Sequence, residues 1–358
     1  MNRVCKVLVC VAVLAAIVLS GCTESLKVEK KSYNGIKQNP SDLLLGVTHA
    51  MSYSEYRQGQ HPDVGKGASY PSKEEILEDL DILTRNSNFT LIRLYNSGES
   101  TERILKIIKE NNIDVKVMLG AWLGAEVSNH EHCSWLHEPI PQDYLDMVTG
   151  WNKTEILNTI RLANQYPDIV VAVNVGNEAL IVWTDHLVPI ESMIAYVRQV
   201  KAGIKQPVTV ADNYGWWIGN GHMLEKEVDF VMVHLYPLWE GKDIDQGMSY
   251  TIDGITKVRE KLPNSKIVIG EIGWTTIGSE FGEKANEENQ KRFYNELYEW
   301  TTKMNITTFW FSAFDEDWKG DPGNQNAAEK HWGVFTIDRK PKLVMQEMYP
   351  DLVPAKKK

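Results

Sequence analysis

Short apolar runs alternate with longer amphipathic stretches along most of the chain. The runs lack the apolar-polar alternation of half-exposed strands, as in Ile267, Val268 and Ile269, and are therefore typical of strands buried on both faces. Eight strands are predicted on this basis, over residues 43–49, 89–95, 114–119, 169–175, 208–212, 230–236, 266–270 and 307–314.

The stretches between these runs have the spacing of amphipathic helices. Ser72 precedes Glu75 and a set of apolar residues at helical intervals, which indicates an N-cap and an acidic first turn. Helices are predicted from Lys73 onward and over residues 102–111, 154–164, 190–204, 251–261 and 286–304. Repeated strand and helix units predict an α/β fold, a single-domain (β/α)8 TIM barrel. The alternative is a doubly wound open sheet, but no Gly-rich phosphate loop follows the first predicted strand.

Two of the predicted strands end in a glycine and an acid. Glu271 follows Gly270, and Glu178 follows Gly176 and Asn177. Active sites of barrel enzymes are built at the carboxyl ends of the strands, so the two acids are expected on one rim. Cleavage of a glycosidic bond needs such a pair. We assign Glu178 the acid/base role and Glu271 the nucleophile role.

The two carboxyl groups must differ in protonation to perform these roles. We expect Arg93 and a hydrogen bond from Tyr236 to keep Glu271 ionised, because a cation and donated hydrogen bonds favour a carboxylate. The pKa of Glu178 is expected to rise once Glu271 carries its charge. Asn177 is predicted to bind the 2-hydroxyl of the sugar.

These residues resemble the motifs of glycoside hydrolase family 17, which contains retaining β-1,3-glucanases with a (β/α)8 fold. The similarity extends from about residue 43 to residue 349. It is carried by motifs in the same order: Gly176-Asn177-Glu178, Gly270-Glu271-Ile272-Gly273-Trp274, Ile92-Arg93-Leu94-Tyr95, Tyr236-Pro237, Phe314-Asp315-Glu316-Asp317-Trp318-Lys319 and His331-Trp332-Gly333. The resemblance implies that Tyr236 lies beside the nucleophile and that Glu316 and Lys319 surround the active site.

One motif departs from the plant members of that family. Thr275 and Thr276 follow the Gly-Trp pair, where plant members usually have proline. The segment from Tyr53 to Pro62 looks more like bacterial and fungal members, some of which transfer glucan instead of hydrolysing it. The substrate and the outcome of the reaction are therefore less constrained than the catalytic pair.

Aromatic residues gather near the predicted strand ends. All 12 Trp lie beyond residue 120, and flat aromatic faces suit the apolar faces of glucose rings. Trp122, Trp217 and Trp274 are predicted to bind substrate, together with Arg93 and Tyr95. Packing in the core is the alternative for each strand-end Trp, because large aromatic residues are often buried.

The first residues have the pattern of a secretory signal. Positive charge precedes an apolar run over residues 7–19, and Leu19-Ser20-Gly21-Cys22 resembles a bacterial lipobox. We therefore expect a signal peptide over residues 1–21, a lipid on Cys22, a flexible tether over residues 22–40 and a glycosidase domain over residues 41–358. A chain processed in this way would be extracytoplasmic and anchored to a bacterial membrane, at the cell surface or in the periplasm.

Charge and cysteine content narrow the range of partners. The net charge is −10, and loss of Arg3 and Lys6 with the signal makes it −12, which disfavours nucleic acid. Cys133 would be the only free thiol left.

We predict no cofactor. A metal site formed by His130, His132, Cys133 and His137 is an alternative, although their spacing matches no closed zinc pattern. A calcium loop around Asp315 is disfavoured because Lys319 occupies a ligand position.

The function that this pattern favours is retaining hydrolysis of β-1,3-glucan of the laminarin type. Transfer to a sugar hydroxyl at the same site is the first alternative, and a glucan-binding surface lipoprotein without catalysis is the second. Endo or exo action depends on whether loops at the rim block one end of the cleft.

Overall fold

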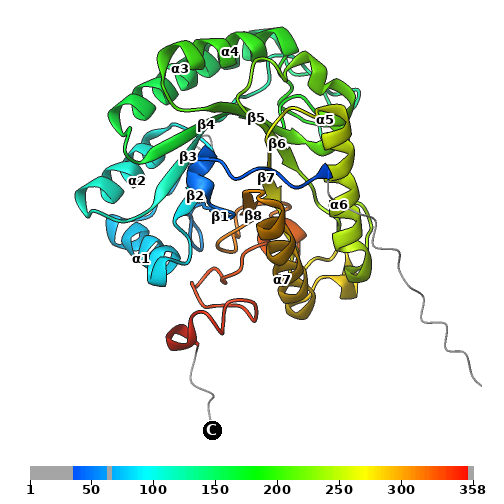
Figure 1. Cartoon of the computed structure of the whole chain (residues 1–358). Helices are drawn as coiled ribbons and strands as arrows, with labels where there is room; N and C mark the ends of the chain where they lie inside the picture. Colours follow the sequence, from blue (N-terminus) through cyan, green and yellow to red (C-terminus); the bar gives the residue numbers. More distant parts are fainter. Residues whose placement is uncertain (1–34, 63–66, 354–358) are drawn as a thin grey trace, which may run out of the picture. The chain divides into compact units, whose positions relative to one another are not determined.

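The computed structural model describes residues 35–62 and 67–353, which form a closed barrel of parallel strands surrounded by helices (Figure 1). The strands pair in chain order, and the last pairs with the first. The predicted (β/α)8 fold is confirmed. The strands are β1 (His49–Ser52), β2 (Leu91–Arg93), β3 (Lys116–Ala121), β4 (Val170–Asn177), β5 (Val208–Asn213), β6 (Val231–His234), β7 (Ile267–Ile272) and β8 (Thr308–Trp310). The helices are α1 (Lys73–Thr84), α2 (Glu99–Glu110), α3 (Gln142–Gln165), α4 (Ile190–Gly203), α5 (Tyr214–Asn220), α6 (Ile244–Lys261) and α7 (Glu287–Met304).

Helix α1 begins where the local sequence supplies partners for its free N–H groups. Glu75 N donates to Oγ of Ser72 at 3.2 Å, and Ser72 N donates to Oε2 of Glu75 at 2.7 Å, which is the predicted cap of α1. Helix α3 begins at Gln142, twelve residues before the predicted start, and α5 was not predicted.

The first strand, which was predicted over residues 43–49, is wrong in position. Residues Leu43–Gly46 form a short 3-10 helix, with left-handed φ angles at Leu44 and Leu45, and β1 begins only at His49. Leu44 is buried inside the barrel with Phe309 and other strand residues. The apolar run at residues 43–45 therefore reflects closure of one barrel end, not strand structure.

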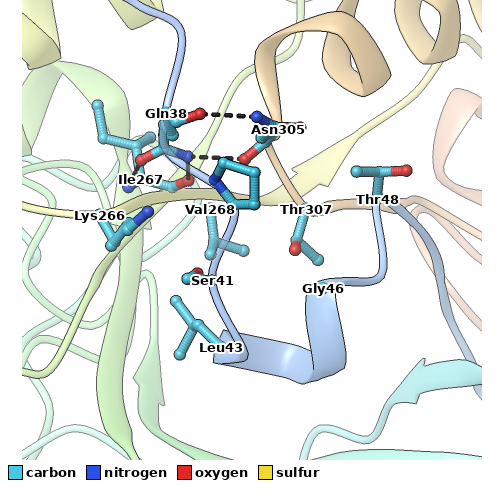
Figure 2. Close-up of a pocket in the computed structure, with 11 residues that line it drawn as sticks. Gln38, Ser41, Leu43, Gly46, Thr48, Lys266, Ile267, Val268, Asn305 and Thr307 are labelled. Carbon is cyan, nitrogen blue, oxygen red and sulfur yellow. Dashed lines mark hydrogen bonds between the residues drawn. The ribbon is translucent and has the colours of Figure 1, made fainter.

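Residues 35–40, which precede this 3-10 helix, are also part of the folded domain, although residues 22–40 were expected to be a flexible tether. The side-chain amide of Gln38 pairs with the first residue of β7: its Nε2 donates to Ile267 O, and Ile267 N donates to its Oε1, both at 2.8 Å. Asn305 Nδ2 donates to Gln38 O at 2.7 Å (Figure 2). Ile36 is buried as well. A small cavity of about 80 Å³ lies at the amino-terminal end of the strands, and its lining includes Gln38, Lys266, Ile267, Val268, Asn305 and Thr307.

In the described chain no α-helix follows β8, and an irregular C-terminal segment takes its place between α1 and α7 (Figure 1). Phe335, Met345 and Tyr349 are buried there. Arg339 donates to both carboxylate oxygens of Asp79 on α1 at 2.8 Å, which fixes this segment to the helix ring.

No helix in the described ranges is both long and apolar enough to cross a membrane.

Candidate active site

Glu178 and Glu271, the two predicted catalytic acids, lie on adjoining parts of one barrel rim. Glu178 directly follows β4, whose pairing with β5 shifts register between Asn174 and Asn177, and its φ is 49°. A left-handed backbone costs a residue with a side chain about 1–2 kcal/mol, and such strain concentrates at functional sites. Glu271 lies within β7 opposite His234 of β6.

The imidazole of His234 lies between the two carboxyl groups. Its Nδ1 is 3.0 Å from Oε1 of Glu178, and its Nε2 is 3.6 Å from Oε1 of Glu271. Because one ring reaches both groups, the acids face each other at a single site, as a glycosidase requires. Their exposure differs: the side chain of Glu178 is 32% exposed, and that of Glu271 is 7% exposed.

Arg93 connects the nucleophile with the residue before the acid/base. Its guanidinium is fully buried, and Nη1 donates to Oε1 of Glu271 at 2.9 Å while Nη2 donates to Oδ1 of Asn177 at 2.5 Å. The planar fork of an arginine suits such a double contact. This contact engages the amide oxygen of Asn177 and so fixes the orientation of the amide.

The surroundings of Glu271 keep it ionised. Burial by itself would raise the pKa of Glu271, but the effect of His234, the charge of Arg93 and the hydrogen bond from Tyr236 outweigh burial and lower it. Tyr236 donates its hydroxyl to Oε2 of Glu271 at 2.7 Å. The predicted partners Arg93 and Tyr236 therefore both contact the nucleophile.

The segment after β8 brings a second charged cluster to the same site. Lys319 Nζ is 2.6 Å from Oε2 of Glu316, and the ammonium lies 4.5 Å from the centre of the Phe311 ring. Trp318 Nε1 donates to Oε1 of Glu316 at 3.2 Å. The charge of Lys319 acts on Glu271, so this pair belongs to the active-site surroundings.

The predicted aromatic contacts divide into two groups. Trp122 is 42% exposed and its ring centre lies 5.1 Å from that of His186. Trp217 and Trp274 are fully buried and donate their Nε1 to the carbonyls of Met232 and Lys284. For these two the prediction of sugar contact is corrected, because they are core residues whose indole N–H groups bind backbone.

Tyr95 lies beside the nucleophile but faces inward. The Arg93 guanidinium lies 4.4 Å from the centre of its ring. Burial raises the pKa of Tyr95 well above its usual value, and the charge of Glu271 adds to this. Its buried hydroxyl has no hydrogen-bond partner within the described part of the chain.

Sequence analysis assigned no role to two residues of the site. His234 stands at the end of the sixth strand beside Tyr236, and that position was its only signal. Glu329 precedes the His331-Trp332-Gly333 motif in an irregular segment. Burial raises the pKa of Glu329 to about 7; Lys319 opposes this increase, and the charges of Glu271 and Glu178 reinforce it. The side chain of Glu329 packs beside Gly320, the residue that follows Lys319, so Glu329 borders the same cluster.

The four residues of the alternative metal loop do not gather as a ligand cluster in the described part of the chain. His130 Nδ1 lies 3.2 Å from Ser128 Oγ, and Cys133 is buried. Throughout residues 35–62 and 67–353, no three His, Cys, Asp or Glu side chains gather in a way that would hold a metal ion.

A closed (β/α)8 barrel with two facing carboxyl groups, one ionised by its surroundings, defines a glycosidase. Residues 50–333 match the model of the BtgE/BtgC glycoside hydrolase domain, and the chain belongs to this family. The expected resemblance to glycoside hydrolase family 17 is confirmed.

Comparisons with individual proteins agree with this family. The chain is 27% identical to a glucan 1,3-beta-glucosidase of Arthroderma benhamiae over 286 residues, which cover 76% of this chain and 84% of that protein. The crystal structure of an endo-laminarinase from Formosa Hel1_33_131 has a TM-score of 0.72 and 28% identity, with 87% of this chain and 88% of that chain covered. A family 17 β-1,3-glucanosyltransferase from Rhizomucor miehei shares the fold, with a TM-score of 0.62, 21% identity, and 84% of this chain and 96% of that chain covered.

Proposed function

We propose that this protein hydrolyses β-1,3-glucan of the laminarin type with retention of configuration. The observation that carries the proposal is the position of one imidazole, His234, between Glu178 and Glu271, in surroundings that lower the pKa of Glu271. The names of the relatives, a glucan 1,3-beta-glucosidase and an endo-laminarinase, support the substrate class.

Each of the two acids has its own role in the proposed two-step reaction. Glu178 donates its proton to the glycosidic oxygen as the bond to the anomeric carbon breaks, while a carboxylate oxygen of Glu271 forms an ester with that carbon. Glu178, now a carboxylate, then takes a proton from water, and the water oxygen replaces Glu271 at the anomeric carbon. Asn177 is oriented by Arg93 to bind the 2-hydroxyl, and Trp122 offers an exposed face to a neighbouring sugar.

The test is incubation with laminari-oligosaccharides, with product length and anomeric configuration followed over time. We expect shorter products of β configuration from the wild type, and loss of activity by several orders of magnitude for Glu271→Ala. Early products longer than the donor would show transfer to a sugar acceptor instead. Binding of laminarin without cleavage by wild type and Glu271→Ala alike would show a binding protein. Cellulose-type β-1,4 oligosaccharides serve as the negative control.

We further propose that a lipid at Cys22 anchors the chain outside the cytoplasm. The support is the charged, apolar and small-residue order of residues 1–22, which lie outside the described residues, as do residues 23–34 of the proposed tether. In a bacterial host, the full chain is expected in the membrane fraction and Cys22→Ser in the soluble extracytoplasmic fraction. Equal partition of the two variants would contradict the anchor. A Cys133→Ser variant controls for loss of a thiol.

A further inference from the structure

The peptide bond that precedes the acid/base is held at both of its polar groups. The N–H of Glu178 donates to the carbonyl of Ala211 on β5 at 2.9 Å. The carbonyl of Asn177, at the other side of the same peptide, lies 2.8 Å from Nε2 of His186. These two contacts fix the peptide plane from which Glu178 takes its left-handed φ of 49°.

Each ring nitrogen of His186 faces one oxygen atom that only accepts hydrogen bonds. Nε2 faces the Asn177 carbonyl, and Nδ1 lies 2.7 Å from Oδ1 of Asp185. The Thr184 hydroxyl, which can donate or accept, lies 3.0 Å from the same Nδ1. A neutral imidazole carries one N–H, so it satisfies one of these oxygens and turns a lone pair toward the other. An imidazolium donates to both. The geometry is therefore complementary to the protonated ring, in a side chain that is only 20% exposed.

Acidic groups of three elements lie around His186, and burial raises the pKa of one of them, Asp212, to about 8. Asp185 precedes it in the loop after β4, Glu178 lies at the end of β4, and Asp212 lies on β5. Burial alone would lower the pKa of His186, but the bonds to Asp185 and the Asn177 carbonyl and the charges of Asp185 and Glu178 outweigh it, so the pKa is raised. The second oxygen of Asp185 accepts from Trp135 Nε1 at 3.0 Å, which holds the carboxylate in place.

We propose that His186, as an imidazolium, is a positioning residue for the acid/base. It clamps the Asn177 carbonyl and so holds the strained backbone from which Glu178 reaches the glycosidic oxygen. The ring face of His186 also supports Trp122, whose exposed indole lies on the same rim. This inference rests on the proposed function for its catalytic consequence, but the protonation of the ring is independent of it.

The sign of the pH dependence follows from the raised pKa. His186 donates to both oxygens while it is protonated, and one of these two bonds is lost as the pH rises through the pKa of the folded protein. The experiment is a histidine NMR titration of the full chain, in the wild type and in Asp185→Asn. We expect a His186 midpoint above the ordinary value of about 6.5 in the wild type and a lower midpoint in Asp185→Asn. A ring that is already neutral at pH 6 would overturn the proposal, whether or not the protein cleaves glucan.

The kinetic arm compares two substrates that differ in their need for a general acid. For laminari-oligosaccharides, kcat/KM of His186→Ala is expected to fall about 10- to 100-fold, because a misplaced catalytic group loses that much. For a dinitrophenyl laminaribioside, whose leaving group departs without protonation, the loss is expected to be less than about threefold. His186→Gln, which keeps one donor toward the Asn177 carbonyl, should recover most of the oligosaccharide activity.

Controls separate positioning from folding. His222→Ala replaces an exposed histidine and should match the wild type on both substrates. Equal losses on both substrates in His186→Ala, or no loss on either, would overturn the positioning role. If His186→Ala melts at a much lower temperature, His186→Gln and the NMR midpoint still decide the question. A wild type that leaves both substrates intact would refute the proposed function, and the titration would still judge the protonation of His186.

Discussion

Two hydrogen-bond donors compete with burial to set the charge of one carboxylate. Glu271 is almost fully enclosed, which would favour its neutral form, yet Arg93 and Tyr236 donate to its two oxygens separately. Each contact reaches a different oxygen, so neither replaces the other. The nucleophile is therefore kept ionised by directed hydrogen bonds and charge, not by contact with solvent.

Removal of one of these donors should move the pH profile in a known direction. Tyr236→Phe removes the bond to Oε2 of Glu271, so the lowered pKa of Glu271 should rise toward its ordinary value. The nucleophile works above its pKa, and the acidic limb of kcat/KM should therefore shift to higher pH. At neutral pH a loss of about 10- to 100-fold is expected, the range for a hydrogen bond to a charged group.

The measurement is the pH dependence of kcat/KM on laminari-oligosaccharides for wild type and Tyr236→Phe. Tyr144→Phe, at an exposed tyrosine of α3, is the matched control and should leave the profile unchanged. A shift of the acidic limb to lower pH would contradict the assignment of Glu271 as the ionised nucleophile.

At the scale of elements, the N-terminal segment acts as an edge partner for the start of β7. Gln38 offers a side-chain amide with one donor and one acceptor, which match the N–H and the carbonyl of Ile267. Its Oε1 also accepts from Arg259 Nη2 of α6 at 2.9 Å, and its backbone bonds to residues at the end of α7. One side chain thus joins β7 to the two neighbouring helices.

The loss of this side chain should weaken the fold without altering catalysis. Gln38→Ala leaves the backbone groups of Ile267 unpaired in a buried place, at an expected cost of about 1–3 kcal/mol in the free energy of unfolding. Urea denaturation should show a lower midpoint with an unchanged slope. Asn39→Ala, an exposed neighbour, is the control. Equal midpoints for all three proteins would show that the segment contributes nothing to stability.

At the scale of the molecule, the repeated strand and helix units made the fold predictable. Which individual side chains are buried could not be predicted from the sequence. Non-alternating strands between amphipathic helices are enough to predict a barrel, and strand-end acids then fall on one rim. The strand predicted over residues 43–49 was misplaced because apolar residues that close a barrel end cannot be distinguished by their apolarity from those of a buried strand. Trp217 and Trp274 were misassigned because an indole near a strand end suits the core and a sugar equally. Glu329 was missed because its loop has no periodicity that places it.

The pairing of β1 with β8 also constrains how the protein is made. Met51 pairs with Trp310, so the ring of strands is completed only after position 310 has left the ribosome. Until then the growing sheet exposes two unpaired edges, and such edges invite association with other chains. Glu316, Lys319 and Glu329 are synthesised later still. A truncated nascent chain therefore lacks both a closed cylinder and a complete set of catalytic neighbours.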